Sequence, residues 1–325
     1  MKLIVKGLLV ASLLAAGLTA KESSKAVEPK AAPTAVATHD VQIFTSENAD
    51  GKITPKSLEE AFKKAGFTIS DNRDMNVPFV KQFKTTTFDV YNLFTLYHKE
   101  TVMELAKEYP NFGLFAPMSM SIYTKKGSKK ISIASLTPGA MAKIMGIPSD
   151  HKQLAGLGKL VREAMKSAMP NGSFETIPYP VSETKEALVV SFEMEVDAEE
   201  WEDEKDDLQM TLESELKPNG FVMAGFNDIN YVFKEEKYEA YDFYDVYSIC
   251  KLPVIYTIAQ TRPEAGAFAP CSLFMYKKKG EDVMHMGFPA VANWISSLSV
   301  EDKKGLEVLK DAKGRMHNIL TELTE

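Results

Sequence analysis

The pattern of apolar and polar residues changes its period many times along the chain, and the same succession of periods occurs twice. Runs rich in Val, Ile, Tyr and Phe that alternate with polar residues predict strands. In the first half these runs cover 41–44, 67 onward, 87–96, 118–124 and 130–136, and in the second half 187–196, 221 onward, 241–252, 271–277 and 282–287. Strands mixed with helices in this order predict an α+β fold, in which each half is a mostly antiparallel sheet with helices packed on one face.

The helices are predicted from apolar residues spaced three and four apart and from the signals at their ends. Thr54 is a favourable N-cap, and Pro55 follows it at the first helical position. Gly66 and Gly220 suit the left-handed position at which many helices end. Further helices are predicted at 99–108, 153–169, 253–261 and 300–323.

The two halves also resemble each other residue by residue. Residues 57–76 align without gaps on 211–230, with seven of twenty positions identical. Residues 110–127 align on 263–280, with ten of eighteen identical. The offset changes only from 154 to 153 between these two blocks. We therefore expect two tandem copies of one domain.

The domain boundaries follow from this repeat and from the composition of the N-terminal segment. Residues 1–20 place two lysines before an uncharged apolar run, which is typical of a signal peptide, and residues 21–38 are an Ala- and Pro-rich flexible linker. The run is shorter than the roughly 20 apolar residues of a spanning helix, although an uncleaved anchor is the alternative. We expect a periplasmic or secreted protein with no membrane span after cleavage, built of one repeat at 39–175 and a second at 184–325.

Charge and cysteine content exclude several classes of protein and partner. The chain has 38 Lys and Arg against 45 Asp and Glu, a formal net charge of −7. Such an acidic balance argues against nucleic-acid binding, which uses basic surfaces. Two cysteines are too few for a disulfide scaffold. A small ligand or a periplasmic protein is left as the expected partner.

The second copy carries a series of motifs in a fixed order. Cys250 ends a Tyr-rich strand, Pro263 and Gly266 precede the pair Pro270-Cys271, and the hairpin strand with Phe274-Met275-Tyr276 follows. In this order the chain resembles domain-of-unknown-function family 302 (DUF302). The resemblance implies the α+β fold but no reaction, because the family has no settled activity. Related single-domain proteins resemble homodimers, so the resemblance also implies a covalently joined pseudo-dimer.

The first copy departs from this motif order at the cysteines. When Asp89-Val90-Tyr91 is aligned on Asp245-Val246-Tyr247, Phe94 stands where the family has its first cysteine. Met118 stands in place of Cys271, the second cysteine. Since only the second copy retains both cysteines, we expect any functional pocket to lie there.

Cys250, Cys271 and Tyr247 are the candidate ligand-binding or redox residues of that pocket. The cysteines are 21 positions apart, so they form no Cys-Xaa-Xaa-Cys motif. A parallel crossover through the helix between their strands would place them at opposite strand ends, too far apart for a disulfide. Two reduced buried thiols, a disulfide, and a metal or reactive site are the three alternatives.

A soft-metal site is a weaker candidate than a plain apolar core. Met284-His285-Met286 lies on the hairpin strand beside that of Cys271, and thiolate, thioether and imidazole together suit Cu(I). Alternation along a strand, however, turns His285 away from both methionines. We predict no cofactor, with Cys271, His285 and Met286 as the ligands if a soft metal is bound.

No complete catalytic set occurs in the sequence. Neither the Gly-Xaa-Ser-Xaa-Gly elbow nor the His-Glu-Xaa-Xaa-His motif is present. This favours a non-enzymatic module that binds a small ligand or a protein partner. The alternative is a thiol-dependent redox or sulfur-handling protein that uses Cys271 and Cys250, so enzymatic activity is left open.

Overall fold

The computed structural model describes residues 39–324, and the predicted signal peptide (1–20) and flexible linker (21–38) lie outside the described residues. The described chain has an α+β fold with two antiparallel sheets and helices. None of its helices between residues 39 and 324 is both long and apolar enough to cross a membrane.

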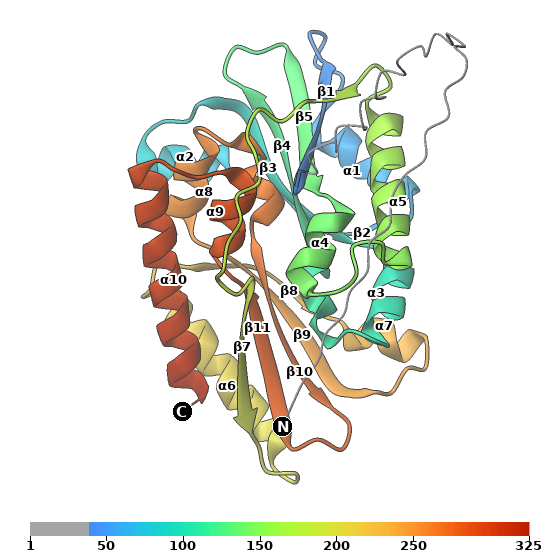
Figure 1. The fold of residues 1–325 in the computed structure, drawn as a ribbon, viewed down its shortest axis with the longest axis vertical. Helices are drawn as coiled ribbons and strands as arrows, with labels where there is room; N and C mark the ends of the chain where they lie inside the picture. Colours follow the sequence, from blue (N-terminus) through green and yellow to red (C-terminus); the bar gives the residue numbers. More distant parts are fainter. Residues whose placement is uncertain (1–38, 325) are drawn as a thin grey trace, which may run out of the picture. The chain divides into compact units, whose positions relative to one another are not determined.

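The first half, residues 39–175, forms a six-stranded sheet in the order β2-β3-β4-β5-β1-β6 (Figure 1). Its strands are β1 (Val41–Glu47), β2 (Thr68–Asp74), β3 (Phe88–Tyr97), β4 (Met118–Lys125), β5 (Lys130–Leu136) and β6 (Ser173–Phe174). Its helices are α1 (Pro55–Lys64), α2 (Asn76–Phe83), α3 (Lys99–Ala106), the 3₁₀ helix η1 (Pro110–Phe115), α4 (Pro138–Met145) and α5 (Lys152–Ala168).

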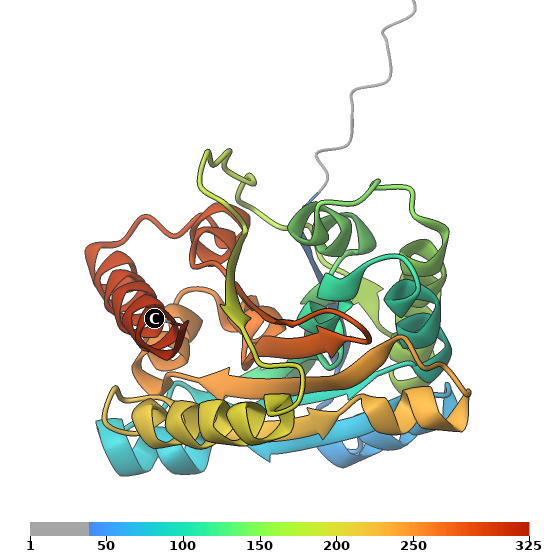
Figure 2. The ribbon, with the colours of Figure 1, turned by 90° about the horizontal axis from the view of Figure 1, so that it is seen from below.

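The second half, residues 184–324, forms a five-stranded sheet in the order β7-β11-β10-β9-β8. Its strands are β7 (Val189–Glu195), β8 (Val222–Asp228), β9 (Tyr241–Cys250), β10 (Cys271–Lys278) and β11 (Val283–Pro289). Its helices are α6 (Trp201–Leu216), α7 (Asn230–Glu235), α8 (Leu252–Ala259), the 3₁₀ helix η2 (Pro263–Phe268), α9 (Ala292–Leu298) and α10 (Lys303–Thr324). Apart from β6, the two strand orders correspond strand by strand. The last long helices of the halves, α5 and α10, stand on opposite flanks in both views (Figures 1 and 2).

The predicted end signals of the first helix of each half are confirmed. Thr54 Oγ1 accepts a hydrogen bond from the Ser57 backbone N–H (3.1 Å), and Ser57 Oγ accepts one from the Thr54 backbone N–H (2.9 Å). This reciprocal pair satisfies two of the backbone donors that a helix start leaves without partners. Gly66 and Gly220, which follow the helix ends, have positive φ angles of 93° and 77°, a region that favours glycine.

Four helices, α2, α4, α7 and α9, were not predicted from the sequence. They have only eight, eight, six and seven residues. Segments this short show barely two turns of periodicity, which is a weak local signal, although α3 and α8, with eight residues each, were predicted. Helices this short are marginal alone, so packing must stabilise them.

Neighbouring residues of the central strands face two different parts of the protein. Met118 of β4 packs toward α3 and α5 of its own half, whereas the next residue, Ser119, donates from Oγ to Pro270 O in the second half (2.8 Å). Strand β10 repeats the arrangement, since Ser272 Oγ donates to Pro117 O in the first half (3.0 Å). Each sheet therefore has one face covered by its own helices and the other covered by the opposite half.

The 3₁₀ helices η1 and η2 fill the space between the two sheets. η1 packs on β10 and β11, and η2 packs on β4 and β5. Tyr91 of β3 donates from its hydroxyl to Pro263 O of η2 (2.9 Å), and Tyr244 of β9 donates to Pro110 O of η1 (2.5 Å). These tyrosines occupy the same register, because Tyr91 pairs with the tyrosine of β4 and Tyr244 with the tyrosine of β10. The contacts between the halves are thus reciprocal.

The segment between the halves contacts the folded protein at several points. Ile177 is buried, and the Tyr179 hydroxyl donates to the Glu264 carboxylate (2.5 Å). The Ser182 backbone N–H donates to Ser296 O (2.9 Å). This segment therefore ties β6 of the first sheet to η2 and α9 of the second half.

Candidate functional site

A cavity opens in the second half where the strand ends of the sheet meet α8, α9 and α10, and we call it the α10 cavity. Its volume is about 100 Å³. Its walls are mostly apolar and include Phe221, Ile255, Trp294, Leu309 and Met316. An apolar cavity of about 150 Å³ holds a benzene molecule. The α10 cavity therefore suits a small apolar group that enters from the mouth.

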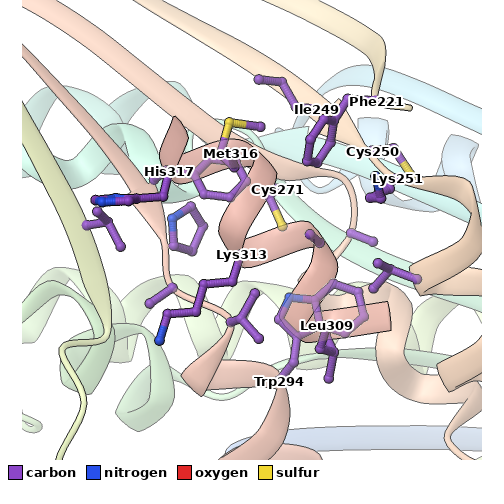
Figure 3. Close-up of a pocket in the computed structure, with 18 of the residues that line it drawn as sticks. Phe221, Ile249, Cys250, Lys251, Cys271, Trp294, Leu309, Lys313, Met316 and His317 are labelled. Carbon is purple, nitrogen blue, oxygen red and sulfur yellow. The ribbon is translucent and has the colours of Figure 1, made fainter. Parts of the chain in front are cut away.

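Two walls of the α10 cavity carry the cysteines (Figure 3). Cys271 begins β10, and Figure 3 shows its sulfur directed into the interior toward Trp294. Its thiol donates weakly to Phe268 O (3.2 Å). Cys250 ends β9 and lies on another part of the wall, next to Lys251.

The arrangement of the cysteines corrects the parallel crossover considered from the sequence. β9 and β10 are antiparallel neighbours, and Cys271 pairs with Ile249. The end of one strand and the start of the next therefore lie at the same edge of the sheet, which brings Cys250 close to Cys271. Both thiols are free, so the structure has two reduced thiols on one cavity.

Burial of Cys250 and partial burial of Cys271 determine the acid–base state of the two thiols. Removal from water raises the pKa of Cys250 and of Cys271 to about 12, because burial disfavours the charged thiolate. The positive charge of Arg73 opposes this increase at Cys250 without reversing it. Since the thiolate is the nucleophile and the metal ligand, both side chains behave at neutral pH as small apolar groups.

Both lysines that line the cavity are paired with a carboxylate. Lys313 and His317 are four residues apart on α10 and line the cavity; Lys313 is paired with Glu186 (2.6 Å). Lys251, whose side chain is largely buried, is paired with Asp311 (3.2 Å). Because the two lysines have partners, the cavity offers a ligand mostly apolar walls.

Tyr247, the third predicted site residue, does not line the α10 cavity. Its side chain lies on the Cys271 face of the sheet but further along β9, where α6 covers it. The hydroxyl donates to Glu213 of α6 (3.4 Å), and the ring packs on Phe226 (centroids 5.0 Å apart). The structure therefore joins Cys250 and Cys271 at one site and leaves Tyr247 outside it.

The structure does not assemble the set Cys271, His285 and Met286. His285 pairs with Tyr276 and stacks on its ring (4.8 Å), on the face opposite to Cys271. Met286 pairs with Met275, four residues along β10 from Cys271. Between residues 39 and 324 no group of three or more His, Cys, Asp and Glu side chains is placed to hold a metal ion. Strand alternation, which the sequence already indicated for His285, is the physical reason.

The corresponding place in the first half is nearly closed. It holds a cavity of only about 10 Å³ between the strand ends, α3 and α5. Met118, the first residue of β4, occupies the position that Cys271 has at the start of β10. Tyr97, the last residue of β3, occupies the position of Cys250. Larger side chains at these two strand ends fill the space that is open in the second half.

The strand register corrects the alignment of Phe94 with the first family cysteine. Leu96 pairs with the first residue of β4, and Ile249 pairs with the first residue of β10. The next residues, Tyr97 and Cys250, are therefore counterparts, and Phe94 lies three positions earlier. The identical Asp-Val-Tyr triplets of the two halves are out of register by three residues.

Sequence reasoning missed the contribution of α9 and α10. Trp294 comes from α9, and Lys313, Met316 and His317 come from α10. The three-and-four spacing of Leu309, Met316 and their apolar neighbours predicts an inward face for α10. Nothing local in the sequence indicates that this face covers the two cysteines.

Fold and cavity together define an α+β protein with an apolar site in its second half. Residues 200–323 match the family model described as "Domain of unknown function DUF302". This match confirms the family resemblance for one domain, and it does not extend to the first half. A similar solved structure is "Crystal structure of uncharacterized conserved protein DUF302 from Bacillus stearothermophilus", with 16% identity and a TM-score of 0.35 over 43% of this chain and 100% of that chain. No curated protein matches this chain.

Proposed function

We propose that the chain is an exported, non-enzymatic binding protein whose second half holds a small apolar ligand in the α10 cavity. The observation that carries the proposal is the contrast between the halves. The same place between sheet and helices is open to about 100 Å³ in the second half and closed to about 10 Å³ in the first. A concave, mostly apolar cavity with a few polar groups in its lining is the usual form of a small-molecule site.

We also propose that the two halves are copies of one domain that form a pseudo-dimer. The matching strand orders support this proposal. So do the reciprocal hydrogen bonds from Tyr91 to Pro263 O and from Tyr244 to Pro110 O, because an isologous interface uses the same residues from both sides. In such a body one copy can keep a ligand site while the other serves as a scaffold.

Ligand binding is favoured over thiol chemistry by the state of the cysteines. A reactive cysteine has a depressed pKa and a partly exposed thiol beside positive charge. Burial instead raises the pKa of Cys250 and Cys271 to about 12. The Cys271 thiol therefore lines the α10 cavity as a small apolar group, and its small size leaves room for a ligand.

Trp294 provides a direct test, because it lines the α10 cavity and the chain has only two tryptophans. In a Trp201→Phe background, Trp294 is the sole tryptophan and its fluorescence reports on the cavity. Iodobenzene is a suitable apolar probe, since its iodine atom quenches an indole only on contact. We expect saturable quenching as iodobenzene is titrated.

Two matched variants separate cavity binding from surface binding. Cys271→Met introduces the first-half side chain and should abolish saturable quenching, whereas Met118→Cys should leave it unchanged. Quenching that rises linearly without saturation, or that survives in Cys271→Met, would contradict the proposal. The unfolding midpoint of each variant shows that the protein is folded during the titration.

A further inference from the structure

A second cavity lies at the junction of the two halves, and we call it the junction cleft. Its volume is about 220 Å³. It opens between β2 and β8, the edge strands of the two sheets, and does not include α10. Ser70, Asp71, Arg73 and Thr95 of the first half give it a polar part, and the rest of its lining, from both halves, is mostly apolar.

The edge strands meet through two reciprocal contacts. Ser70 Oγ donates to Asn227 Oδ1 (3.0 Å), and Arg73 Nη2 donates to Ala224 O (3.1 Å). β2 begins at Thr68 and β8 at residue 222, so Ser70 corresponds to Ala224 and Arg73 to Asn227. These contacts hold the strands in place without closing the cleft between them.

Several hydrogen-bond donors in the junction cleft have no partner between residues 39 and 324. Arg73 uses Nη2 for both Asp71 (2.8 Å) and Ala224 O, which leaves its Nε and Nη1 donors unused. Asn227 Nδ2 is buried and makes no hydrogen bond within the described chain. An unsatisfied buried donor such as Asn227 Nδ2 is costly, and the half-exposed Arg73 side chain has donors free for an acceptor that enters the cleft.

Residues of both halves supply apolar surface to the cleft. Phe226 is 47% exposed and Val222 is 52% exposed, and both line the cleft together with Leu93 and Leu252. Large apolar side chains that stay exposed at the rim of a cavity are characteristic of a ligand site. A matching ligand therefore has an acceptor at one end and an apolar body at the other.

We infer that the junction cleft is a second ligand site that takes a small organic carboxylate. One of the free Arg73 donors and the Asn227 amide would bind the carboxylate, and Phe226 and Leu252 would contact an aromatic ring or a short alkyl chain. A charge-assisted hydrogen bond from a guanidinium to a carboxylate is among the stronger hydrogen bonds, and the Nε and Nη1 donors of Arg73 are each free to make one. Asp71 already accepts from Arg73 and from the backbone N–H of Asn72, so it orients the guanidinium rather than filling the cleft.

The site is separate from the α10 cavity and does not depend on the function proposed for it. Cys250 lines both cavities and is the wall between them. Arg73, Asn227 and Phe226 line only the junction cleft. Variants at these positions therefore test the second site alone.

Benzoate is the probe, and the full chain labelled with ¹⁵N is titrated with it by NMR. We expect the side-chain amide of Asn227 and the Nε–H of Arg73 to shift with one common saturation curve. Benzyl alcohol has the same ring without the charge and should bind at least about tenfold more weakly, as expected from a charge-assisted hydrogen bond. Equal affinity for both compounds would overturn the carboxylate assignment.

Arg73→Gln should raise the dissociation constant of benzoate at least about tenfold. Arg315→Gln is the matched control, because Arg315 and Arg73 are each 47% exposed and paired to an aspartate at 2.8 Å, and it should leave affinity unchanged. Phe226→Ala changes a side chain with no hydrogen bond to Arg73, and it should also lower the affinity for benzoate. If Arg73→Gln retains wild-type affinity, or if Cys271→Met alone abolishes binding, benzoate sits elsewhere and the inference fails. If iodobenzene does not bind but benzoate behaves as expected, only the function proposed for the α10 cavity fails.

Discussion

The two halves of the protein present the same backbone arrangement with different side chains at one place. At the ends of the paired strands the second half has Cys250 and Cys271, and the first half has Tyr97 and Met118. The larger side chains of the first half reduce the cavity from about 100 Å³ to about 10 Å³. The comparison shows that the fold supplies a position for a site, and that side-chain size at two strand ends decides whether a site exists.

The contacts between the halves, in contrast, are equal on both sides. Tyr91 and Tyr244 bond to the same position of η2 and η1, and Gly266 and Gly113 let those segments approach the facing sheet. Corresponding residues of the two halves are thus alike at the interface between the halves and different at the cavity. A protein of this kind can change the side chains that line a cavity in one half while it keeps the packing that holds both halves together.

The largest expected effect concerns the thiols that distinguish the second half. With a pKa of about 12 instead of the ordinary value of 9.0, the thiolate fraction near pH 8 falls about a thousandfold. We expect labelling by an aromatic disulfide reagent to be slower by at least that factor in the folded protein than in the unfolded one. Between pH 7 and 9 the folded-state rate should rise about tenfold per pH unit, because each unit raises the thiolate fraction tenfold. Rapid labelling of native protein that levels off below pH 9 would restore the thiol-dependent alternative.

The next effect tests the matched interface. A Cβ added to Gly266 would lie 2.5 Å from Ser121 Cβ and 2.9 Å from Leu93 Cδ2, closer than real contacts allow. Gly266→Ala should therefore lower the free energy of unfolding by about 3 kcal/mol, as overpacking does. Gly156 in α5 has open space around it, so Gly156→Ala should raise the free energy of unfolding by up to about 1 kcal/mol. Denaturant titration measures both, and a small loss in Gly266→Ala would show that the halves are not held as tightly as described.

An intermediate effect is expected from exchanging the cavity side chains. Met118→Cys removes buried atoms and opens the first-half cavity, which should lower the free energy of unfolding by about 2 kcal/mol. Cys271→Met fills the α10 cavity instead, and it should cost less than Met118→Cys. Chemical unfolding of both variants checks the difference. If Met118→Cys and Cys271→Met lowered the free energy of unfolding equally, the strand-end positions of the two halves would not be equivalent.

The smallest effect concerns Glu264, whose counterpart in the first half is the neutral Asn111. Burial raises the pKa of Glu264 above its ordinary value of 4.5, and the Tyr179 hydrogen bond and Arg262 reduce the increase. The folded state therefore binds the carboxyl proton of Glu264 more tightly than the unfolded state does. The free energy of unfolding consequently falls as the pH rises from about 4.5 through the raised pKa of the folded state. Glu264→Gln should remove this fall and increase stability at neutral pH. Thermal unfolding at pH 4 to 8 measures it, with the exposed Glu186→Gln as a control that should keep the wild-type slope.

Local signals predicted much of the fold. The predicted strand pairs 118–124 with 130–136 and 271–277 with 282–287 form hairpins, and each turn contains a Lys-Lys-Gly sequence whose glycine, Gly127 or Gly280, has a positive φ angle of 75° or 78°. Strand β4 begins at Met118 and strand β10 at Cys271, as expected. These features depend on two to ten consecutive residues, and turn chemistry and side-chain alternation act over that range.

The site could be predicted only in part. The preference for the second half and the two cysteines followed from the motif order, but Tyr247 was placed at the pocket and Phe94 was aligned with Cys250. Both errors concern register along β3 and β9. Register is decided by pairing with distant strands, as in the pairing of Tyr91 with Tyr123. Three identical residues in a row are weaker evidence for register than this pairing.

By itself the sequence determined the order of strands and helices, their repetition, the family of the second half and the residues in which the halves differ, because periodicity and identity are properties of neighbouring residues. Only the tertiary structure decided that Cys250 and Cys271 share a cavity, that α10 covers it and that a cleft opens between β2 and β8. These outcomes depend on contacts between residues far apart in the chain, such as Cys271 with Met316 and Arg73 with Ala224. Such contacts depend on the packing of the whole protein, because each closely packed element limits the positions that the other elements can occupy.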